Sequence, residues 1–162
     1  MFQIIDVAGG WFVIMISSET DAFSIECTKY AGIDIGAQLL GIANSLIENQ
    51  PVRHYICLNS EQYVYRMELQ QNGKSVKVLL CEITGSKDSS VTAFRFYDPS
   101  PSALDFSSAK PPVFAAEYDA FEVAKSIYVA FRDIDKAKYQ QNWFPFPRAE
   151  YDRLHQFMKY RI

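Results

Sequence analysis

The chain has 162 residues, of which 49% are hydrophobic and 22% are charged, so it has enough apolar mass for a core and is not a disordered tail. Its length is typical of one domain, which we expect to span residues 1–162. The 16 basic against 19 acidic side chains give a net charge of −3, which argues against a dedicated nucleic-acid-binding protein because such proteins carry a basic surplus.

Apolar residues in the first thirty positions follow the pattern of β-strands. Residues 2–7 and 11–17 are separated by Gly9-Gly10, a dipeptide typical of hairpin turns. Residues 11–16 are apolar on both faces, which is typical of a central strand that is covered on both sides. Residues 23–28 alternate between apolar and polar, as in a strand with one face in water. We therefore expect a three-stranded meander.

Residues 34–49 have the clearest helical pattern in the chain. Their apolar residues recur at steps of three and four, Asp34 is a suitable N-cap, and Pro51 marks the end of the helix. The dipeptide Asn72-Gly73 predicts the turn of a later hairpin. Further strands are expected at four places: 52–58, 63–69, 75–83 and 91–97.

The C-terminal half is expected to be mainly helical. Residues 98–112 hold four of the seven prolines and are expected to form a surface loop. A short strand over 113–116 precedes a helix over 117–135, and Pro147 suits the first position of a last helix. Residues 136–147 end in Trp143-Phe144-Pro145-Phe146-Pro147, and we expect this segment to be extended.

These elements predict an α+β fold in a single domain, with a bent antiparallel sheet of about six or seven strands packed against two or three helices. The N-terminal residues suggest no signal peptide or membrane anchor, because the longest apolar stretch is shorter than the ~20 residues that a spanning helix needs. We expect a cytoplasmic protein. The three cysteines, Cys27, Cys57 and Cys81, lack Cys-x-x-Cys spacing and are expected to be reduced.

The sequence lacks the motifs that carry common chemistry. It has no Gly-x-Ser-x-Gly nucleophile elbow, no phosphate-binding glycine loop and no calcium-loop spacing. We therefore expect no catalytic residue, no cofactor and no metal ion, and a protein that is not an enzyme. The alternative is a small enzyme or ligand-binding domain with a pocket between sheet and helices that uses His54, His155 or tyrosines.

Aromatic and acidic side chains are the candidates for a protein-binding surface. Aromatic residues concentrate binding energy at interfaces, and tyrosine is favoured at contact surfaces. The alternative for the aromatic residues of 136–147 is that their rings pin the segment across the sheet, and for the acids it is a solvated helix face. The candidate residues are Trp143, Phe144, Phe146, Tyr63, Tyr65, Glu117 and Asp119.

The order of elements resembles that of a known group of proteins. A meander is followed by the amphipathic segment Ile33-Asp34-Ile35-Gly36-Ala37-Gln38-Leu39-Leu40, a run of antiparallel strands, the stripe from Phe121 to Ile134, the aromatic segment and a last helix. This arrangement resembles the small cytosolic immunity proteins of bacterial contact-dependent inhibition and related polymorphic toxin systems.

The resemblance implies a non-enzymatic inhibitor that binds a cognate toxin domain, such as a nuclease, and blocks its active site. It implies a protein partner rather than nucleic acid or membrane. The mild acidity of the chain is compatible with this, because nucleases have basic substrate clefts. A further alternative is an adaptor or structural subunit of a larger complex.

Overall fold

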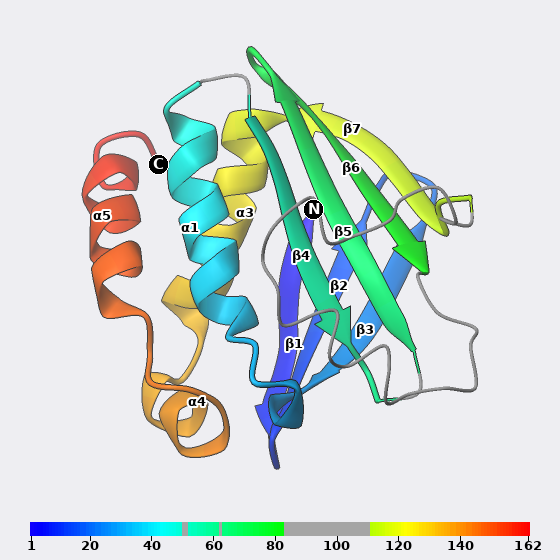
Figure 1. The fold of residues 1–162 in the computed structure, drawn as a ribbon. Coiled ribbons are helices and arrows are strands. Elements are labelled where there is room, and N and C mark those ends of the chain that lie inside the picture. The colour runs from blue at the N-terminus through cyan, green and yellow to red at the C-terminus, as the bar shows by residue number, and fades with distance from the viewer. Residues whose placement is uncertain (50–51, 62, 83–110) are drawn as a thin grey trace.

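The fold was described from a computed structural model, which places residues 1–49, 52–61, 63–82 and 111–162. Its strands form two antiparallel sheets (Figure 1). The first sheet has the order β1 (Phe2–Ala8), β2 (Trp11–Ser17) and β3 (Ala22–Thr28). The second has the order β4 (Val52–Asn59), β5 (Val64–Asn72), β6 (Ser75–Glu82) and β7 (Phe114–Asp119). The α+β class is confirmed, but the prediction of one bent sheet is corrected to a three-stranded and a four-stranded sheet.

The predicted meander is confirmed as the first sheet. Gly9 and Gly10 turn the chain between β1 and β2 with φ of 58° and 84°, values that suit glycine because it lacks a Cβ. Val13 of β2 pairs with Asp6 on one side and with Glu26 on the other, and a register shift between Ile4 and Asp6 leaves Ile5 as a bulge.

The helices agree with the sequence in part. Helix α1 (Ile35–Ile47) begins after Asp34, whose carboxylate accepts a hydrogen bond from the backbone N–H of Ala37 at 3.1 Å. The second predicted helix is shorter than expected, because α3 (Ala120–Asp133) begins only after Asp119 caps it. Residues 117–119 therefore belong to β7 and not to a helix.

The prediction that residues 136–147 are extended is wrong over its first half. Residues Lys136–Asn142 form helix α4, because the carboxylate of Asp135 accepts hydrogen bonds from the backbone N–H groups of Ala137 and Lys138. Pro145 and Pro147 lie in the non-helical segment after α4, and the last helix α5 (Arg148–Met158) begins directly after Pro147. The predicted strand over 91–97 lies outside the described residues, as does almost all of the predicted loop over 98–112.

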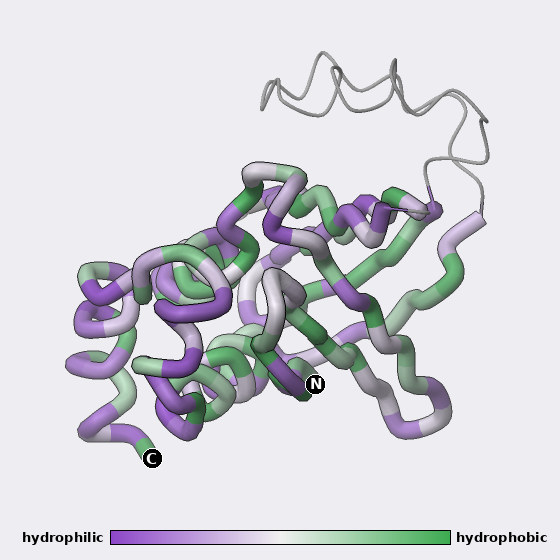
Figure 2. The backbone as a smooth tube through the Cα atoms, turned by 90° about the horizontal axis from the view of Figure 1, so that it is seen from below, coloured by the Kyte–Doolittle hydropathy of each residue, from purple (hydrophilic) through white to green (hydrophobic). Residues whose placement is uncertain are grey.

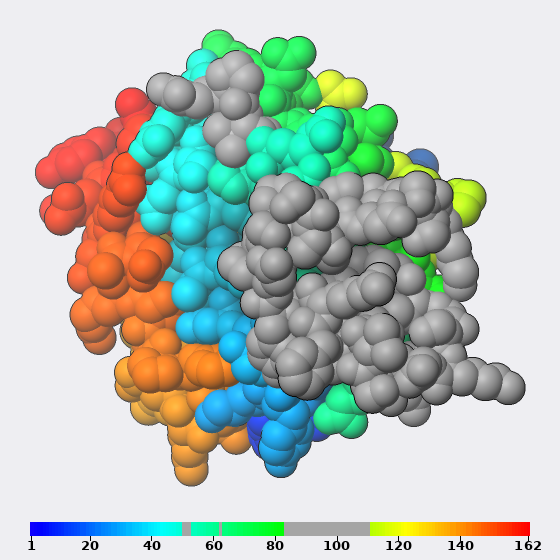
Figure 3. Space-filling view, in the orientation of Figure 1, coloured from blue at the N-terminus to red at the C-terminus, as the bar shows by residue number. Residues whose placement is uncertain are grey.

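Helices α1, α3 and α5 pack together at one side of the two sheets (Figures 1 and 2). Helix α5 lies along α1 at the surface (Figure 3). The buried faces of these helices and the inner faces of both sheets form one hydrophobic core. No helix in the described part of the chain is long and apolar enough to cross a membrane.

Candidate protein-binding surface

Two of the predicted surface aromatics belong to the core. The side chain of Trp143 is 1% exposed and its ring lies 5.4 Å from that of Phe12 of β2. Phe146 is 7% exposed and packs edge-on against Tyr139 and Tyr151, each at 5.5 Å. The structure therefore places these two rings in the core, where they anchor the segment as in the alternative interpretation of residues 136–147.

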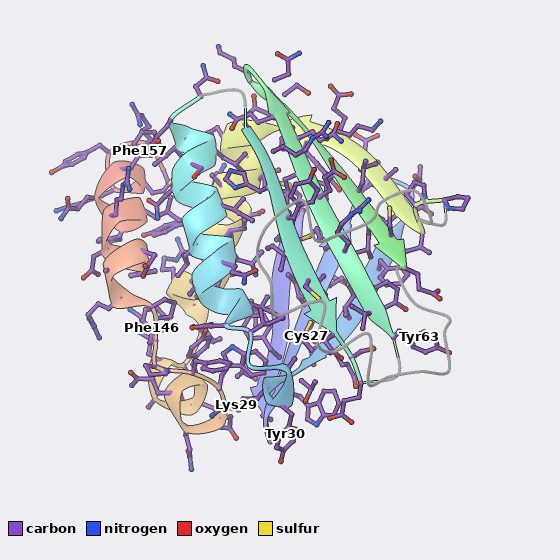
Figure 4. The ribbon with its side chains drawn as sticks, in the orientation of Figure 1. Cys27, Lys29, Tyr30, Tyr63, Phe146 and Phe157 are labelled. Carbon is purple, nitrogen blue, oxygen red and sulfur yellow. The ribbon has the colours of Figure 1, made fainter. Side chains whose placement is uncertain are left out.

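The remaining predicted residues do not form one patch. Phe144 is half-buried and packs edge-on against Trp143. Tyr63 is 47% exposed and stands beside the half-buried Tyr65, at the side of the molecule away from Phe146 (Figure 4). Glu117 and Asp119 are exposed at positions i and i+2 of β7, where strand geometry places them on one face rather than on two sides of a helix.

A different surface combines apolar and acidic side chains. In β2, Phe12, Ile14 and Ile16 point into the core, so the alternate residues point away from it. Trp11, Val13 and Met15 are half-buried and lie outside the set of hydrophobic side chains that pack on the core. We name this surface the β1–β3 face, made of Gln3, Ile5, Asp6, Trp11, Val13, Met15, Ser24 and Glu26.

The outer side of the central strand of the β1–β3 face is only half-buried. The main packing partners of the first sheet are α3 and α4 at β1 and β4 at β3, so they meet it at its two edge strands. Ile5 is 53% exposed at the bulge of β1. The prediction that residues 11–16 are covered on both sides is therefore corrected: the strand is central in its sheet, but only one of its faces lies in the core.

Acidic side chains lie on both sides of this apolar strip and at one of its ends. Asp6 and Glu26 flank Val13 from the two neighbouring strands, and Glu19 and Asp21 are exposed in the β2–β3 turn. A hydrogen bond from Lys138 at 2.7 Å holds the pKa of Asp6 below its usual value. Among the described residues, Glu19, Asp21 and Glu26 form no ion pair, so the rim of the face carries an excess of negative charge.

A groove of about 460 Å³ lies beside this face, between the β1 edge and α3. Its charged side chains are engaged in ion pairs: Lys125 lies 3.4 Å from Glu122, and Asp133 lies 2.6 Å from Arg132. The hydrogen bond from Arg132 holds the pKa of Asp133 below its usual value. The groove is lined by Met1, Phe2, Gln3, Ile4, Glu122, Lys125, Ser126, Val129, Ala130, Asp133 and Ile134.

The surroundings of the two histidines and of Cys27 and Cys57 do not form an activated nucleophile among the described residues. Nδ1 of His155 lies 2.7 Å from the hydroxyl of Tyr128, and burial lowers the pKa of His54. Burial raises the pKa of the Cys27 thiol and that of Cys57, the latter to about 12, so both are protonated and weakly nucleophilic. Among the residues that the structure places, no group of three or more His, Cys, Asp or Glu could hold a metal ion.

Comparison of the chain with protein-family models, curated proteins and solved structures finds no match. The β1–β3 face was not predicted from sequence, because a run that is apolar on both faces does not tell which face is covered. The signal that was available is the register: a meander with a tight Gly9-Gly10 turn places Asp6 and Glu26 beside Val13.

Proposed function

We propose that this chain is a non-enzymatic protein-binding protein, namely an immunity protein that neutralises a cognate bacterial toxin domain in the cytoplasm by covering its active site. The observation that carries the proposal is the β1–β3 face, where the apolar strip of Trp11, Val13 and Met15 has an acidic rim. An apolar centre within a charged rim is the usual anatomy of a protein interface.

The two parts of the face act differently in binding. The carboxylates of Glu19, Asp21 and Glu26, which form no ion pair within the described part of the chain, attract a basic partner and increase its association rate. Trp11, Val13 and Met15 then lose water on contact and slow dissociation, because buried aromatic and apolar anchors supply most binding energy. A nuclease toxin meets this description, since its substrate cleft is basic in order to bind phosphates.

An adaptor role would use the same face, whereas an enzyme would use the groove between β1 and α3. The ion pair of Asp133 with Arg132 favours the binding role, because it holds the pKa of Asp133 below its usual value, whereas a general acid or base needs a pKa near the working pH. A toxin inhibitor and an adaptor are distinguished by protection of cells.

The test is co-expression with the candidate toxin encoded by the gene immediately upstream. We expect growth to be restored and the two proteins to elute as one complex from a sizing column. Glu26→Lys should weaken the complex, whereas Glu117→Lys makes the same change of charge on the second sheet and should leave it intact. Loss of growth together with separate elution of the two proteins would refute the proposal.

A further inference from the structure

The bulge in β1 changes which side chains of this strand point outward. Ile4 packs against the core, so regular alternation along the strand would turn the side chain of Asp6 inward as well. The register shift between Ile4 and Asp6 interrupts this alternation, and Asp6 pairs instead with the outward-facing Val13. As a result, the consecutive residues Ile5 and Asp6 are both exposed at the edge of the β1–β3 face, whereas Val7 is buried.

The carboxylate of Asp6 is held in place, but only one of its oxygens is used. Its Oδ1 accepts the backbone N–H of Val7 at 2.8 Å and the ammonium of Lys138 at 2.7 Å. Its Oδ2 accepts no hydrogen bond from any residue that the structure places. A guanidinium binds a carboxylate through two parallel hydrogen bonds, one to each oxygen, whereas an ammonium acts as a point charge. Asp6 is therefore suited to hold an arginine more firmly than it holds Lys138.

Lys138 is free to leave Asp6 without loosening α4. The two side chains are 51% and 49% exposed, and ion pairs at the surface contribute little to stability. Helix α4 packs beside the end of β1 (Figure 1), where the backbone N–H of Gly9 donates to Oδ1 of Asn142 at 2.9 Å. Tyr139 of the same helix is fully buried. Because these contacts hold the helix, Lys138 is a displaceable occupant, and its charge shows which kind of group the site accepts.

We propose that the β1 bulge anchors an arginine of the partner, whose guanidinium displaces Lys138 from Asp6 and whose aliphatic stem packs on Ile5. Ile5 is 53% exposed and offers an apolar surface to that stem. Lys138 then contributes to specificity, because a basic protein without an arginine at this place meets a face on which Asp6 is already neutralised. This inference rests on the proposed function for the identity of the partner, but the arginine site itself is measured without any toxin.

The first experiment uses a capped peptide, acetyl-Leu-Thr-Arg-Thr-Leu-amide, as the probe, and the same peptide with lysine in place of arginine as its control. Titration of the arginine peptide into the labelled protein should shift the side-chain carboxyl resonance of Asp6 and the amide resonance of Val7. The lysine peptide should bind about twofold to fivefold more weakly, because it makes one hydrogen bond to the carboxylate in place of two. Equal affinity of the two peptides, or no shift at millimolar peptide, would overturn the proposal.

Variants of the ion pair assign the peptide to Asp6. Lys138→Gln removes the competitor and should raise the affinity for the arginine peptide about twofold to fivefold. Lys77→Gln makes the same change of charge at an exposed position of β6 and should bind the peptide as the native chain does. Asp6→Asn should abolish the preference for arginine over lysine. Equal affinity of the two lysine variants, or a preference that persists in Asp6→Asn, would overturn the assignment.

Failure of the arginine site and failure of the proposed function give different results. A toxin complex whose dissociation rate is unchanged by Asp6→Asn would refute the arginine site alone. Arginine-selective peptide binding that requires Asp6, by a chain that gives cells no protection, would support the site and refute the immunity function.

Discussion

The hydroxyl of Tyr139 occupies the space in which a side chain at position 36 would lie. A Cβ on Gly36 would stand 2.0 Å from that oxygen, and the hydroxyl also lies 3.4 Å from the carboxylate of Asp34. Helix α4 is thereby docked on the first turn of α1. A glycine, which weakens a helix by about 1 kcal/mol relative to alanine, is the residue that allows this approach.

We predict that Gly36→Ala destabilises the fold. Overpacking costs roughly 1–3 kcal/mol, and the gain in helix propensity offsets about 1 kcal/mol of it. Gly41 is the matched control, since a Cβ there would meet no atom within 4 Å. Gly41→Ala should be neutral or stabilising by up to about 1 kcal/mol. Urea unfolding of both variants is the measurement, and equal effects would show that Tyr139 does not restrict position 36.

The pH dependence of stability should contain a contribution from Asp34. Burial raises the pKa of its carboxyl above the ordinary value of 3.8, despite hydrogen bonds from Ala37 and Tyr139. The folded state therefore holds a proton that the unfolded state has released, so the free energy of unfolding falls as the pH rises from 3.8 through the raised pKa.

Asp34→Asn keeps an N-cap acceptor and removes this titration. Over that pH interval, we expect the native chain to lose stability relative to the variant, as measured by urea unfolding at a series of pH values. A native chain that instead gains stability relative to the variant would mean that the hydrogen bonds outweigh burial at this carboxyl.

Turns and helix caps, which are determined by residues adjacent in the sequence, could be predicted from the sequence. The Gly9-Gly10 turn and the Asp34 cap are of this kind, and both are found where they were expected. The sequence also contains the N-cap Asp135, which predicts helix α4. The extended segment was predicted from Pro145 and Pro147, and that prediction wrongly included the residues that precede them. A proline restricts only the residue before it and the turn it occupies, so seven residues remained free to form a helix.

The division into two sheets and the site depend on distant contacts. Strand pairing is decided by which faces meet in the core, and no local pattern records that the strands of residues 2–28 pair among themselves, or that those of 52–82 pair with one another and with 114–119. The same reason explains Trp143: its ring is buried against Phe12, more than a hundred residues away. The sequence alone does not show whether this aromatic side chain packs in the core or binds another protein.

Trp143 should therefore act in stability rather than in binding. Trp143→Ala removes a fully buried ring and should cost about 3–5 kcal/mol. Phe144→Ala is the control from the same segment, since Phe144 is half-buried and should cost less. Thermal and urea unfolding measure both effects. A Trp143→Ala variant with native stability would contradict the placement of this ring in the core.

The thiol of the half-buried Cys57 should react slowly until the chain unfolds. With a pKa of about 12, the Cys57 thiol is ionised in only about 1 in 10,000 molecules at pH 8. Its alkylation by iodoacetamide, followed by peptide mass spectrometry, should be slow in the folded protein and faster in urea by several powers of ten. Rapid alkylation of Cys57 under native conditions would contradict the burial that raises its pKa.

The acidic rim of the β1–β3 face should control the rate at which a basic partner is captured. Glu26→Lys reverses an exposed charge beside Val13 and should lower the association rate constant by about threefold to tenfold at low salt, with little effect on dissociation. The native association rate should fall as salt is added, because the attraction is screened. Trp11→Ser should have the opposite signature, a faster dissociation with association nearly unchanged.

The control for this prediction is Glu117→Lys, which changes the net charge by the same amount at an exposed position of the second sheet. Stopped-flow mixing with the partner across a range of salt concentrations separates the two rates. All three substituted residues are exposed or half-buried, so each variant should unfold at nearly the native urea concentration. If Glu117→Lys slowed association as much as Glu26→Lys, net charge alone would attract the partner, and the β1–β3 face would have no special part in its capture.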